Sequence, residues 1–255
     1  MKITILQRPG HHTSRDFSSS LESTLHSLKG DLGASFKLDG FSQKGWARVD
    51  IQGEDSEVAK QLLIRDLGQA QTDLMDVEAQ GVYEGIISTG LNDNLEVDIG
   101  IESPTPVNVK IGLEALRAQL ADGKPLRINE IIREYCLIPG SRAAVRITRL
   151  EQGKHSVEGW LADSQIERLA GWIGTRLDRI QISDSYRREV EYAIKRANLE
   201  RDIVSVEPIT LTAQSVVCKL GTDGVGLIPK LGSVLREREL NPFIPKRIIT
   251  RCRPW

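Results

Sequence analysis

The sequence predicts a mixed α+β protein of several domains: a small α/β unit, a central β-barrel and a C-terminal α/β unit. Three observations lead to this expectation. The 255 residues are more than one compact core usually serves. Residues 95–101 alternate apolar and polar side chains, which is typical of a half-buried strand. Helix-like and strand-like stretches occur on both sides of that segment, so we expect domains at 1–79, 80–162 and 163–255.

The first domain is expected to have the order β-α-β-β-α. Its helices are indicated by leucines at spacings of three and four, and its strands by short apolar runs between glycines. The expected elements are a strand at 3–6, a helix at 14–28, strands at 35–38 and 46–51, and a helix from 55 with its apolar face at Val58, Leu62, Leu63 and Leu67.

The middle domain is expected to be an OB-type barrel. Strands separated by an inserted helical segment and closed by a hairpin are typical of this Greek-key form, which leaves no free sheet edge. The expected strands are 82–87, 95–101, 107–111, 143–147 and 156–161, with turns at 90–94 and 151–154 and helices at 113–120 and 129–135.

The last domain is expected to hold two helices followed by the order β-β-α-β. Ser164 and Glu167 have the spacing of a capping box, ahead of apolar residues that continue at helical spacing to Ile180. Pro229 is expected in the first turn of a helix. The remaining expected elements are a helix at 184–197, strands at 204–211 and 215–220, a helix at 231–240 and a strand at 243–249.

Composition limits the classes of function. The net charge of −1 gives the chain no overall attraction to nucleic acid, and aromatic residues make up only 5%. Cys136, Cys218 and Cys252 are far apart and contain no CxxC pair, so we expect neither disulfides nor a zinc site, and a reducing cytoplasm. No stretch approaches the roughly 20 apolar residues of a membrane span.

Two segments carry resemblances to known families. Gly81-Val82-Tyr83-Glu84-Gly85 followed by Leu95-Glu96-Val97-Asp98-Ile99-Gly100 resembles an S1-type RNA-binding OB domain. Residues 217–223 and 226–232 resemble an uncharacterised archaeal family, domain of unknown function 2110. The first resemblance implies an RNA-binding barrel. The second implies an archaeal cytoplasmic origin and no particular activity.

The expected barrel departs from the S1 pattern on the outer face of its second strand. S1 domains usually place an aromatic residue there, whereas this strand is expected to present Glu96, Asp98 and Glu102. Carboxylates offer no stacking surface and repel phosphate. These three residues are therefore assigned to contact with a protein partner. A hard cation is an alternative use, although a solvated strand face is favoured over it because no fourth ligand is visible.

No recognisable catalytic centre is present, so the chain is expected not to be an enzyme and to need no metal or other cofactor. His11-His12 is interpreted as a polar loop, and the glycine-rich segment 221–226 as a connecting turn in preference to a phosphate cradle. Cys136 is expected to be a buried hydrophobe. Cys252 lies between two arginines that favour a thiolate, although an exposed cysteine without function is the preferred interpretation.

Basic residues gather toward the C-terminus, where residues 219–255 carry eight Lys or Arg against three Asp or Glu. Guanidinium groups beside an indole can bind phosphate and stack on a base. The leading hypothesis is a non-enzymatic RNA- or ribonucleoprotein-associated protein with a translation-related role. The alternative is a protein–protein adaptor that uses the acidic barrel face. The expected nucleic-acid-binding residues are Arg187, Arg188, Lys195, Arg196, Lys230, Lys246, Arg247, Arg251, Arg253 and Trp255.

Overall fold

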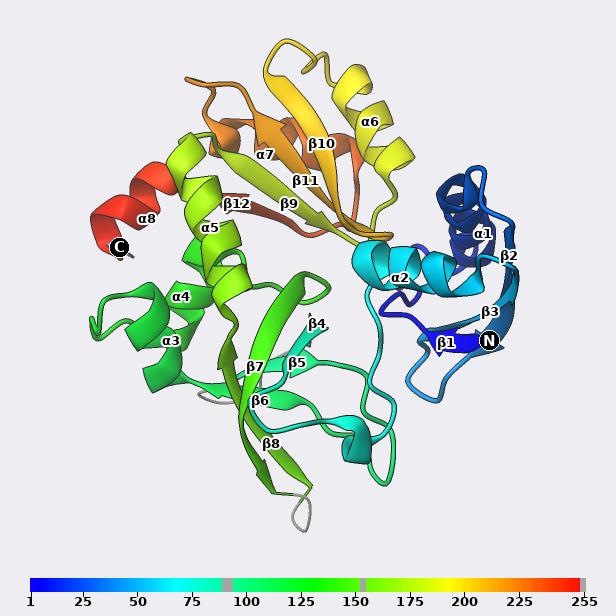
Figure 1. Ribbon diagram of the computed structural model, residues 1–255. Coiled ribbons are helices and arrows are strands. Elements are labelled where there is room, and N and C mark those ends of the chain that lie inside the picture. The colour runs from blue at the N-terminus through cyan, green and yellow to red at the C-terminus, as the bar shows by residue number, and fades with distance from the viewer. Residues whose placement is uncertain (89–93, 152–154, 253–255) are drawn as a thin grey trace.

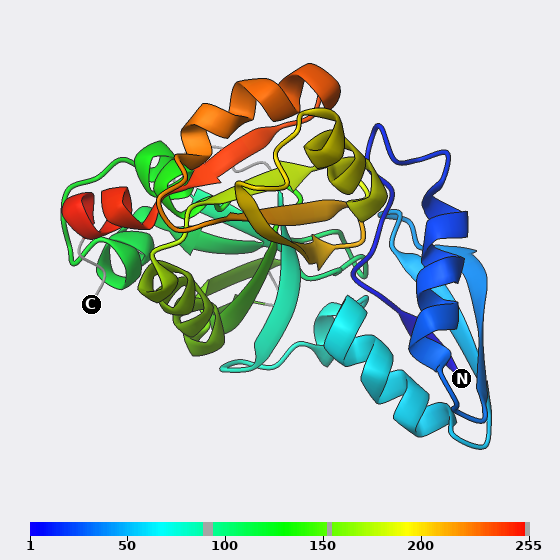
Figure 2. The same ribbon diagram turned by 90° about the horizontal axis from the view of Figure 1, so that it is seen from above.

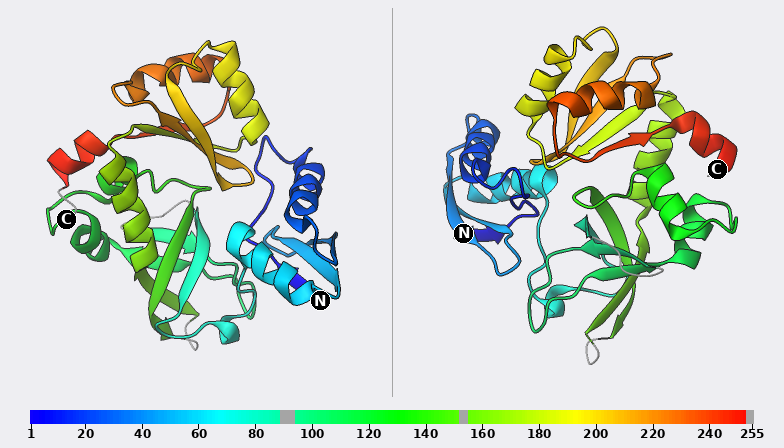
Figure 3. Two further views of the ribbon diagram at one scale, coloured as in Figure 1. Left: turned by 45° about the horizontal axis from the view of Figure 1, so that its top comes forward. Right: turned by 180° about the vertical axis from the view of Figure 1, so that it is seen from behind.

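The computed structural model describes residues 1–88, 94–151 and 155–252. The chain forms three units, two built on separate sheets and one on a closed barrel, which meet around a common centre (Figures 1 and 3). The predicted multi-domain α+β class is confirmed. The domain boundaries near 79 and 163 stay predictions.

The N-terminal unit is a three-stranded antiparallel sheet with two helices packed against it (Figure 2). Its strands lie in the order β1-β3-β2. Helix α2 contributes Ala59, Leu63 and Leu67 to the core, whereas Val58 is 54% exposed. Leu63 and Leu67 of the predicted apolar face are confirmed, and Ala59 takes the core position that was predicted for Val58. The elements are β1 (Lys2–Thr4), α1 (Phe17–Lys29), β2 (Ala34–Phe41), β3 (Ala47–Gly53) and α2 (Ser56–Leu67).

The middle unit is a closed five-stranded barrel in the order β4-β5-β6-β8-β7. The β6–β8 pair is parallel and the other pairs are antiparallel. Gly85 is required in β4, because a Cβ there would lie 2.6 Å from Val97 Cγ1 of β5. The elements are a 3₁₀ turn, η1 (Leu74–Asp76), then β4 (Val82–Ser88), β5 (Asn94–Asp98), β6 (Val109–Gly112), α3 (Leu113–Leu120), α4 (Ile128–Tyr135), β7 (Arg142–Glu151) and β8 (Ser156–Leu161).

The second barrel strand is shorter than expected, since β5 ends at Asp98 and residues 99–101 continue as buried irregular chain. The turns predicted at 90–94 and 151–154 lie largely outside the described residues. Around the second of them, Glu151 of β7 pairs with Ser156 of β8, so the two predicted strands are neighbours.

The C-terminal unit is an antiparallel sheet in the order β10-β11-β9-β12, with the chain order β-α-β-β-α-β of a ferredoxin-like split βαβ unit. The elements are α5 (Asp163–Thr175), β9 (Arg179–Ser183), α6 (Arg187–Arg196), β10 (Ile203–Thr210), β11 (Ala213–Cys218), α7 (Gly224–Val234), β12 (Leu240–Phe243) and α8 (Pro245–Arg251).

Strand β9 was predicted as the end of a helix, and that prediction was wrong. The helix α5 stops at Thr175, after which Arg176 adopts a left-handed conformation with φ of 56°. Apolar residues at 177 and 180 happen to continue the helical spacing, but Ile180 is fully buried between sheet neighbours. The predicted capping box is also absent. The N-cap is Ala162, and Ser164 lies inside the first turn.

Two further elements near the C-terminus differ from expectation. Helix α7 begins at Gly224 because the Asp223 side chain accepts a hydrogen bond from Val225 N, so Pro229 lies inside the helix and not in its first turn. The predicted strand at 243–249 is mostly helix, since β12 ends at Phe243 and Pro245 opens α8. Proline suits the first helical turn because its missing N–H would have no partner there.

The barrel core extends into the C-terminal part of the chain. Leu169 and Ile173 of α5, Phe243 of β12 and Ile248 of α8 belong to the same apolar cluster as the barrel strands. Figure 1 shows α5 and α8 gathered with α3 and α4 on one side of the barrel. The last helix is therefore a cover for the barrel unit and not a free tail.

Candidate functional site

The acidic barrel face is covered by the N-terminal unit. Asp98 is 2% exposed, and its carboxylate accepts from Lys44 Nζ at 2.6 Å and Arg8 Nη1 at 3.4 Å. The Arg8 guanidinium also stacks on the buried Trp46 ring, 4.5 Å from its centroid. The prediction that Asp98 faces solvent was wrong, because a strand's outer face can be covered by a segment distant in sequence.

Glu102 is engaged by the same loop of the N-terminal unit. It accepts hydrogen bonds from Ser42 Oγ and from Lys44 N, the latter at 2.8 Å. Glu96 is part-buried and accepts from Asn108 Nδ2 at 3.0 Å. Two of the three carboxylates assigned to an external partner thus bind the protein's own first domain. This contact joins the first domain to the barrel. Asp98 and Glu102 are occupied by it and do not form an open surface for an external partner.

The basic C-terminal end is fastened to the barrel unit in a similar way. Arg247 Nε and Arg251 Nη1 donate to the two oxygens of Glu134, at 2.5 and 2.6 Å, and Glu134 is 1% exposed. Arg251 also pairs with Glu130 at 3.1 Å. These arginines, predicted to bind phosphate, anchor α8 on α4. Arg253 and Trp255 lie outside the described residues.

Cys252 belongs to the same contact and is fully buried, so both sequence-based interpretations of an accessible thiol were wrong. Burial raises the pKa of its thiol, and the nearby Glu134 carboxylate adds to that rise. Cys136 is buried, as expected, and burial raises the pKa of its thiol as well.

The remaining predicted basic residues are exposed. Arg187 Nε pairs with Glu191 at 2.7 Å, and Arg188 Nη2 pairs with Asp16 at 2.9 Å. Lys195 and Arg196 lie at the end of the same helix, and Lys230 and Lys246 lie on α7 and α8. Four of them thus share α6, which contacts α7, whereas Lys246 lies apart from them on α8 (Figure 1).

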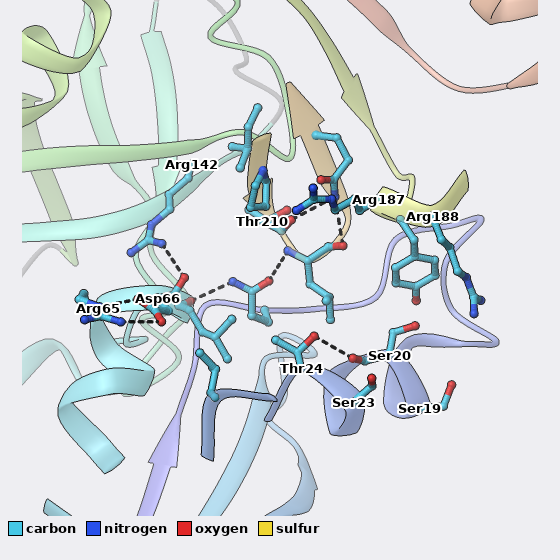
Figure 4. Close-up of a pocket in the computed structure, with 18 residues that line it drawn as sticks. Ser19, Ser20, Ser23, Thr24, Arg65, Asp66, Arg142, Arg187, Arg188 and Thr210 are labelled. Atoms are coloured by element: carbon cyan, nitrogen blue, oxygen red, sulfur yellow. Dashed lines mark hydrogen bonds and ion pairs between the residues drawn. The ribbon is translucent and has the colours of Figure 1, made fainter. Parts of the chain in front are cut away.

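A cleft of about 950 Å³ lies where the three units meet (Figure 4). One wall is α1 and the end of α2, the opposite wall is α6 with the end of β10, and Arg142 of the barrel lies at one end. The polar residues that line it are Gln7, Ser19, Ser20, Ser23, Thr24, Arg65, Asp66, Arg142, Tyr186, Arg187, Arg188, Thr210 and Gln214.

The floor of the cleft is held by hydrogen bonds between the units. Gln7 donates to Leu67 O of α2 and accepts from Leu211 N beside β10, both at 2.9 Å. Tyr186 donates from its hydroxyl to Thr13 O at 2.7 Å, and Arg188 lies 5.5 Å from the centroid of that ring. The cleft is therefore a defined junction between the units.

Positive charge exceeds negative charge on the cleft walls, which contain four arginines and one carboxylate. Arg65 forms a two-pronged pair with Asp66 at 2.6 and 3.0 Å and holds the pKa of that carboxyl below its usual range. Arg142 pairs with Glu84 at 3.0 Å and donates to Asp66 O. Arg187 and Arg188 lie at the rim of the cleft, where their ion pairs with Glu191 and Asp16 are exposed to solvent.

Sequence reasoning found two of these arginines and missed the rest of the cleft. Arg187 and Arg188 were chosen for their charge, whereas Arg65 and Arg142 are single charges in unrelated segments. The run Ser18-Ser19-Ser20 with Ser23 and Thr24 was the available signal, because it makes one face of α1 rich in hydroxyl groups. The sequence alone does not show that this face of α1 lies opposite α6, because that depends on how the units pack together.

Other chemistry weighed from the sequence finds little support. Within residues 1–88, 94–151 and 155–252, no group of three His, Cys, Asp or Glu side chains could hold a metal ion. The glycine-rich segment before α7 is closed to phosphate, because Asp223 and Asp178 accept its first free backbone N–H groups, from Val225 and Gly224. No helix among the described residues is long and apolar enough to cross a membrane.

Comparison with family models places both ends of the chain in one family. The DUF2110 N-terminal domain matches residues 4–73, and the DUF2110 C-terminal domain matches residues 177–241. The chain belongs to the DUF2110 family. The expected membership is confirmed, and the barrel lies between the two matched segments. A search of curated proteins gives no match to this DUF2110 chain.

Among solved structures, the chain is similar to an a/eIF2alpha-aDim2p-rRNA complex from Pyrococcus horikoshii OT3, at 12% identity and a TM-score of 0.26. That match covers 48% of this chain and 64% of the other, so this chain spans less than two thirds of it. It is also similar to the intact alpha subunit of aIF2 from Pyrococcus abyssi, at 9% identity and a TM-score of 0.24, over 66% of this chain and 97% of the other.

Proposed function

We propose that this DUF2110 protein is a non-enzymatic RNA- or ribonucleoprotein-associated binding protein that holds the backbone of a single strand in the cleft between its three units. The observation that carries the proposal is the meeting of guanidinium and hydroxyl groups from all three units in one cleft of about 950 Å³. Phosphate oxygens are contacted in proteins mainly by Arg and Lys, by hydroxyl side chains and by backbone N–H groups.

The rim arginines are available to a ligand. The Arg187 and Arg188 side chains are 59% and 66% exposed, and their carboxylate partners are 46% and 60% exposed. Ion pairs in such positions contribute about 0–1 kcal/mol, so a phosphate group can replace the carboxylate at little cost. Ser23 and Thr24 on the facing helix add hydroxyl groups across the cleft.

The barrel supports the same proposal indirectly. Its motifs resemble S1-type RNA-binding domains, but the outer face of β5 is acidic and is docked against the loop around Lys44. RNA contact is therefore assigned to the three-unit cleft, and the barrel supplies Arg142 to it. The S1 resemblance is also the basis for proposing a translation-related setting.

The three free, buried cysteines suit a reducing cytoplasm, which we propose as the site of action.

A salt titration tests the proposal. Binding of a short single-stranded RNA is measured by fluorescence anisotropy for the parent and for the double variant Arg187→Ser/Arg188→Ser. If both arginines contact phosphate, the slope of log K against log salt becomes shallower by about 1.4, which is about 0.7 for each lost contact on a single strand.

The matched control is Arg48→Ser/Arg201→Ser, which removes two exposed arginines that do not line the cleft. The control should keep the parental slope. An equal effect from both pairs would mean that only net charge matters and would overturn the cleft as the site. A parent that binds no RNA at low salt, yet retains a protein partner after nuclease treatment, would replace the proposal with the adaptor alternative.

A further inference from the structure

A second, smaller hollow of about 250 Å³ lies between the barrel, α5 and the sheet of the C-terminal unit. It adjoins the large cleft, because Arg142, Pro208 and Ile209 line both. Its polar lining includes Ser141, Gln165 and Gln181, which are 5%, 3% and 3% exposed. Polar side chains buried to this degree usually have all of their hydrogen-bonding groups satisfied.

Arg168 lines this hollow and has no carboxylate partner among the described residues. Its Nη2 donates to Arg142 O at 2.8 Å and to Gln165 Oε1, whereas its buried Nε has no hydrogen-bond partner. Burial lowers the pKa of this guanidinium, which nevertheless stays charged. A buried charge that lacks a counter-charge destabilises a fold unless something else neutralises it.

The unsatisfied groups around the hollow are hydrogen-bond donors. Gln165 Oε1 accepts from Ala144 N and from Arg168 Nη2, which fixes the orientation of the amide and leaves its Nε2 without an acceptor in the described chain. Gln181 Oε1 accepts from Ser141 Oγ at 3.0 Å, and its amide nitrogen is left in the same condition. A ligand that fits this set must supply acceptors and negative charge.

The acidic residue in the lining is already neutralised. Glu207 accepts from Arg179 Nη1 at 2.6 Å, and Arg179 is stacked on Trp172 at 4.8 Å. Arg142 is paired with Glu84 as well, so the positive balance in the hollow comes from Arg168, the lining cation without a bonded carboxylate among the described residues. A compact oxyanion fits within its volume and matches its charge and its unfilled donors.

We propose that this hollow binds the terminal phosphate monoester of an RNA strand that lies in the adjoining cleft. The proposal rests on the proposed function, since the strand reaches the hollow past Arg142. Arg168 would donate from Nη1, and Gln165 and Gln181 from their amide nitrogens. Inorganic phosphate offers the same acceptors, so it is a second source of the same ligand chemistry.

The first experiment compares RNA oligonucleotides of one sequence that carry a 5′-phosphate, a 3′-phosphate or hydroxyl groups at both ends. The parent should bind one of the phosphorylated forms about tenfold or more tightly than the hydroxyl form, as expected for charge-assisted hydrogen bonds to a terminal phosphate. Arg168→Met should abolish that preference and leave binding of the hydroxyl-ended strand unchanged.

The second experiment uses inorganic phosphate alone and measures the melting temperature. Phosphate that binds only the folded state should raise the melting temperature of the parent as its concentration increases. Phosphate also stabilises proteins without binding a site, and Arg168→Met measures that general effect. The rise in melting temperature of the parent beyond the rise of Arg168→Met is the part due to the site. Arg168→Lys serves in both experiments if Arg168→Met fails to fold, because it keeps the charge but lacks Nε and Nη1.

The outcomes separate the two proposals. Equal binding of all three oligonucleotides, with no phosphate effect beyond that in Arg168→Met, would overturn the hollow as an oxyanion site. The cleft would still stand if binding kept its salt dependence on Arg187 and Arg188. Stabilisation by inorganic phosphate without binding of any oligonucleotide would support the oxyanion site, assign it to free phosphate and overturn the RNA cleft.

Discussion

The arginines of α8 and α6 are alike in the sequence and opposite in the structure. Arg247 and Arg251 of α8 bind Glu134, whose side chain is 1% exposed, whereas Arg187 and Arg188 of α6 pair with carboxylates that are 46% and 60% exposed. Burial of the carboxylate decides the role of the arginine. A buried carboxylate must keep its cation, while an exposed one can give it up to a ligand.

The acidic face of the barrel behaves like the arginines of α8, although here the residue expected to bind a partner is a carboxylate. Asp98 was expected to attract a partner and is buried against Lys44 and Arg8 of the first domain. The acidic barrel face and the basic C-terminal end were both assigned to partners from charge alone, and both include contacts that join the units. The candidate binding surface is instead the cleft between the units.

Removing the Glu134 charge should have the largest effect on stability. In Glu134→Gln, Arg247 and Arg251 lose their shared carboxylate and α8 loses its anchor on α4. We expect the free energy of unfolding to fall by about 3 kcal/mol, as when one partner of a buried ion pair is removed. Urea denaturation followed by circular dichroism measures this change.

Glu130→Gln is the matched control, because Glu130 bonds to Arg251 from a less buried position on the same helix. Its effect should be clearly smaller. Similar losses in both variants would show that burial of Glu134 is not what distinguishes the α8 contact from the cleft arginines.

The next largest effect is expected at the contact between the first domain and the barrel. Asp98→Asn leaves Lys44 and Arg8 without their carboxylate and should lower the free energy of unfolding by about 2 kcal/mol. Glu96→Gln, on the same strand but not bound to either cation, should change it by less than about 0.5 kcal/mol. Limited proteolysis should cut the loop around residue 44 sooner in Asp98→Asn. An unchanged cleavage rate would show that Asp98 does not hold this loop against the barrel.

The thiol at the end of α8 gives a smaller effect that depends on pH. Burial raises the pKa of Cys252 in the folded state, whereas in the unfolded state the thiol ionises near about 8.5. The folded state therefore holds the proton more tightly, and the thiol's contribution to stability is full below pH ~8.5 and is lost as pH rises. The free energy of unfolding of the parent should fall above that pH, by at most about 1.4 kcal/mol per pH unit from this thiol.

Cys252→Ala should have a shallower decline at high pH by this amount and the parental pH dependence below about pH 8. Identical slopes for the two proteins at high pH would mean that Cys252 titrates alike in both states, and hence that the end of α8 does not bury it. The measurement thus checks the α8 anchor without changing any of its ion pairs.

Local patterns predicted the fold well where neighbours in sequence decide the structure. The helix at 113–120 and the strand at 156–161 were predicted at their observed bounds, because leucines at helical spacing and apolar–polar alternation are set by the element itself. Strand β9 was missed because its Ile180 also fits the period of the preceding helix, and only sheet partners 30 or more residues away select the strand.

The candidate site was less predictable than the fold, because it depends on contacts between units. Arg65 and Arg142 are 77 positions apart, and each looks like an ordinary surface charge until α2 and β7 meet at the cleft. Glu134 was not considered at all, since a glutamate in a short helix is usually exposed. Its burial follows from α8, which was itself predicted as a strand.

The smallest expected effect concerns Lys246, an exposed basic residue of α8 that is not part of the Glu134 contact. Helix α8, to which it belongs, lies on the opposite side of the molecule from α1 (Figures 1 and 3). Lys246→Ser should leave the free energy of unfolding within about 0.5 kcal/mol of the parent, because solvated surface charges contribute little. This variant therefore tests the basic C-terminal end without detaching α8, which a change at Arg247 or Arg251 would risk.

RNA affinity of Lys246→Ser is measured across a range of salt concentrations beside Arg187→Ser/Arg188→Ser. A strand confined to the cleft does not reach α8, so the salt slope of Lys246→Ser should equal that of the parent. A slope shallower by about 0.7 would instead reveal one phosphate contact at this position. That result would extend the bound strand to the basic C-terminal end, where Arg253 and Trp255 follow in the sequence. The contrast between α6 and α8 would then be one of degree, because both helices would contact RNA while only α8 also anchors the fold.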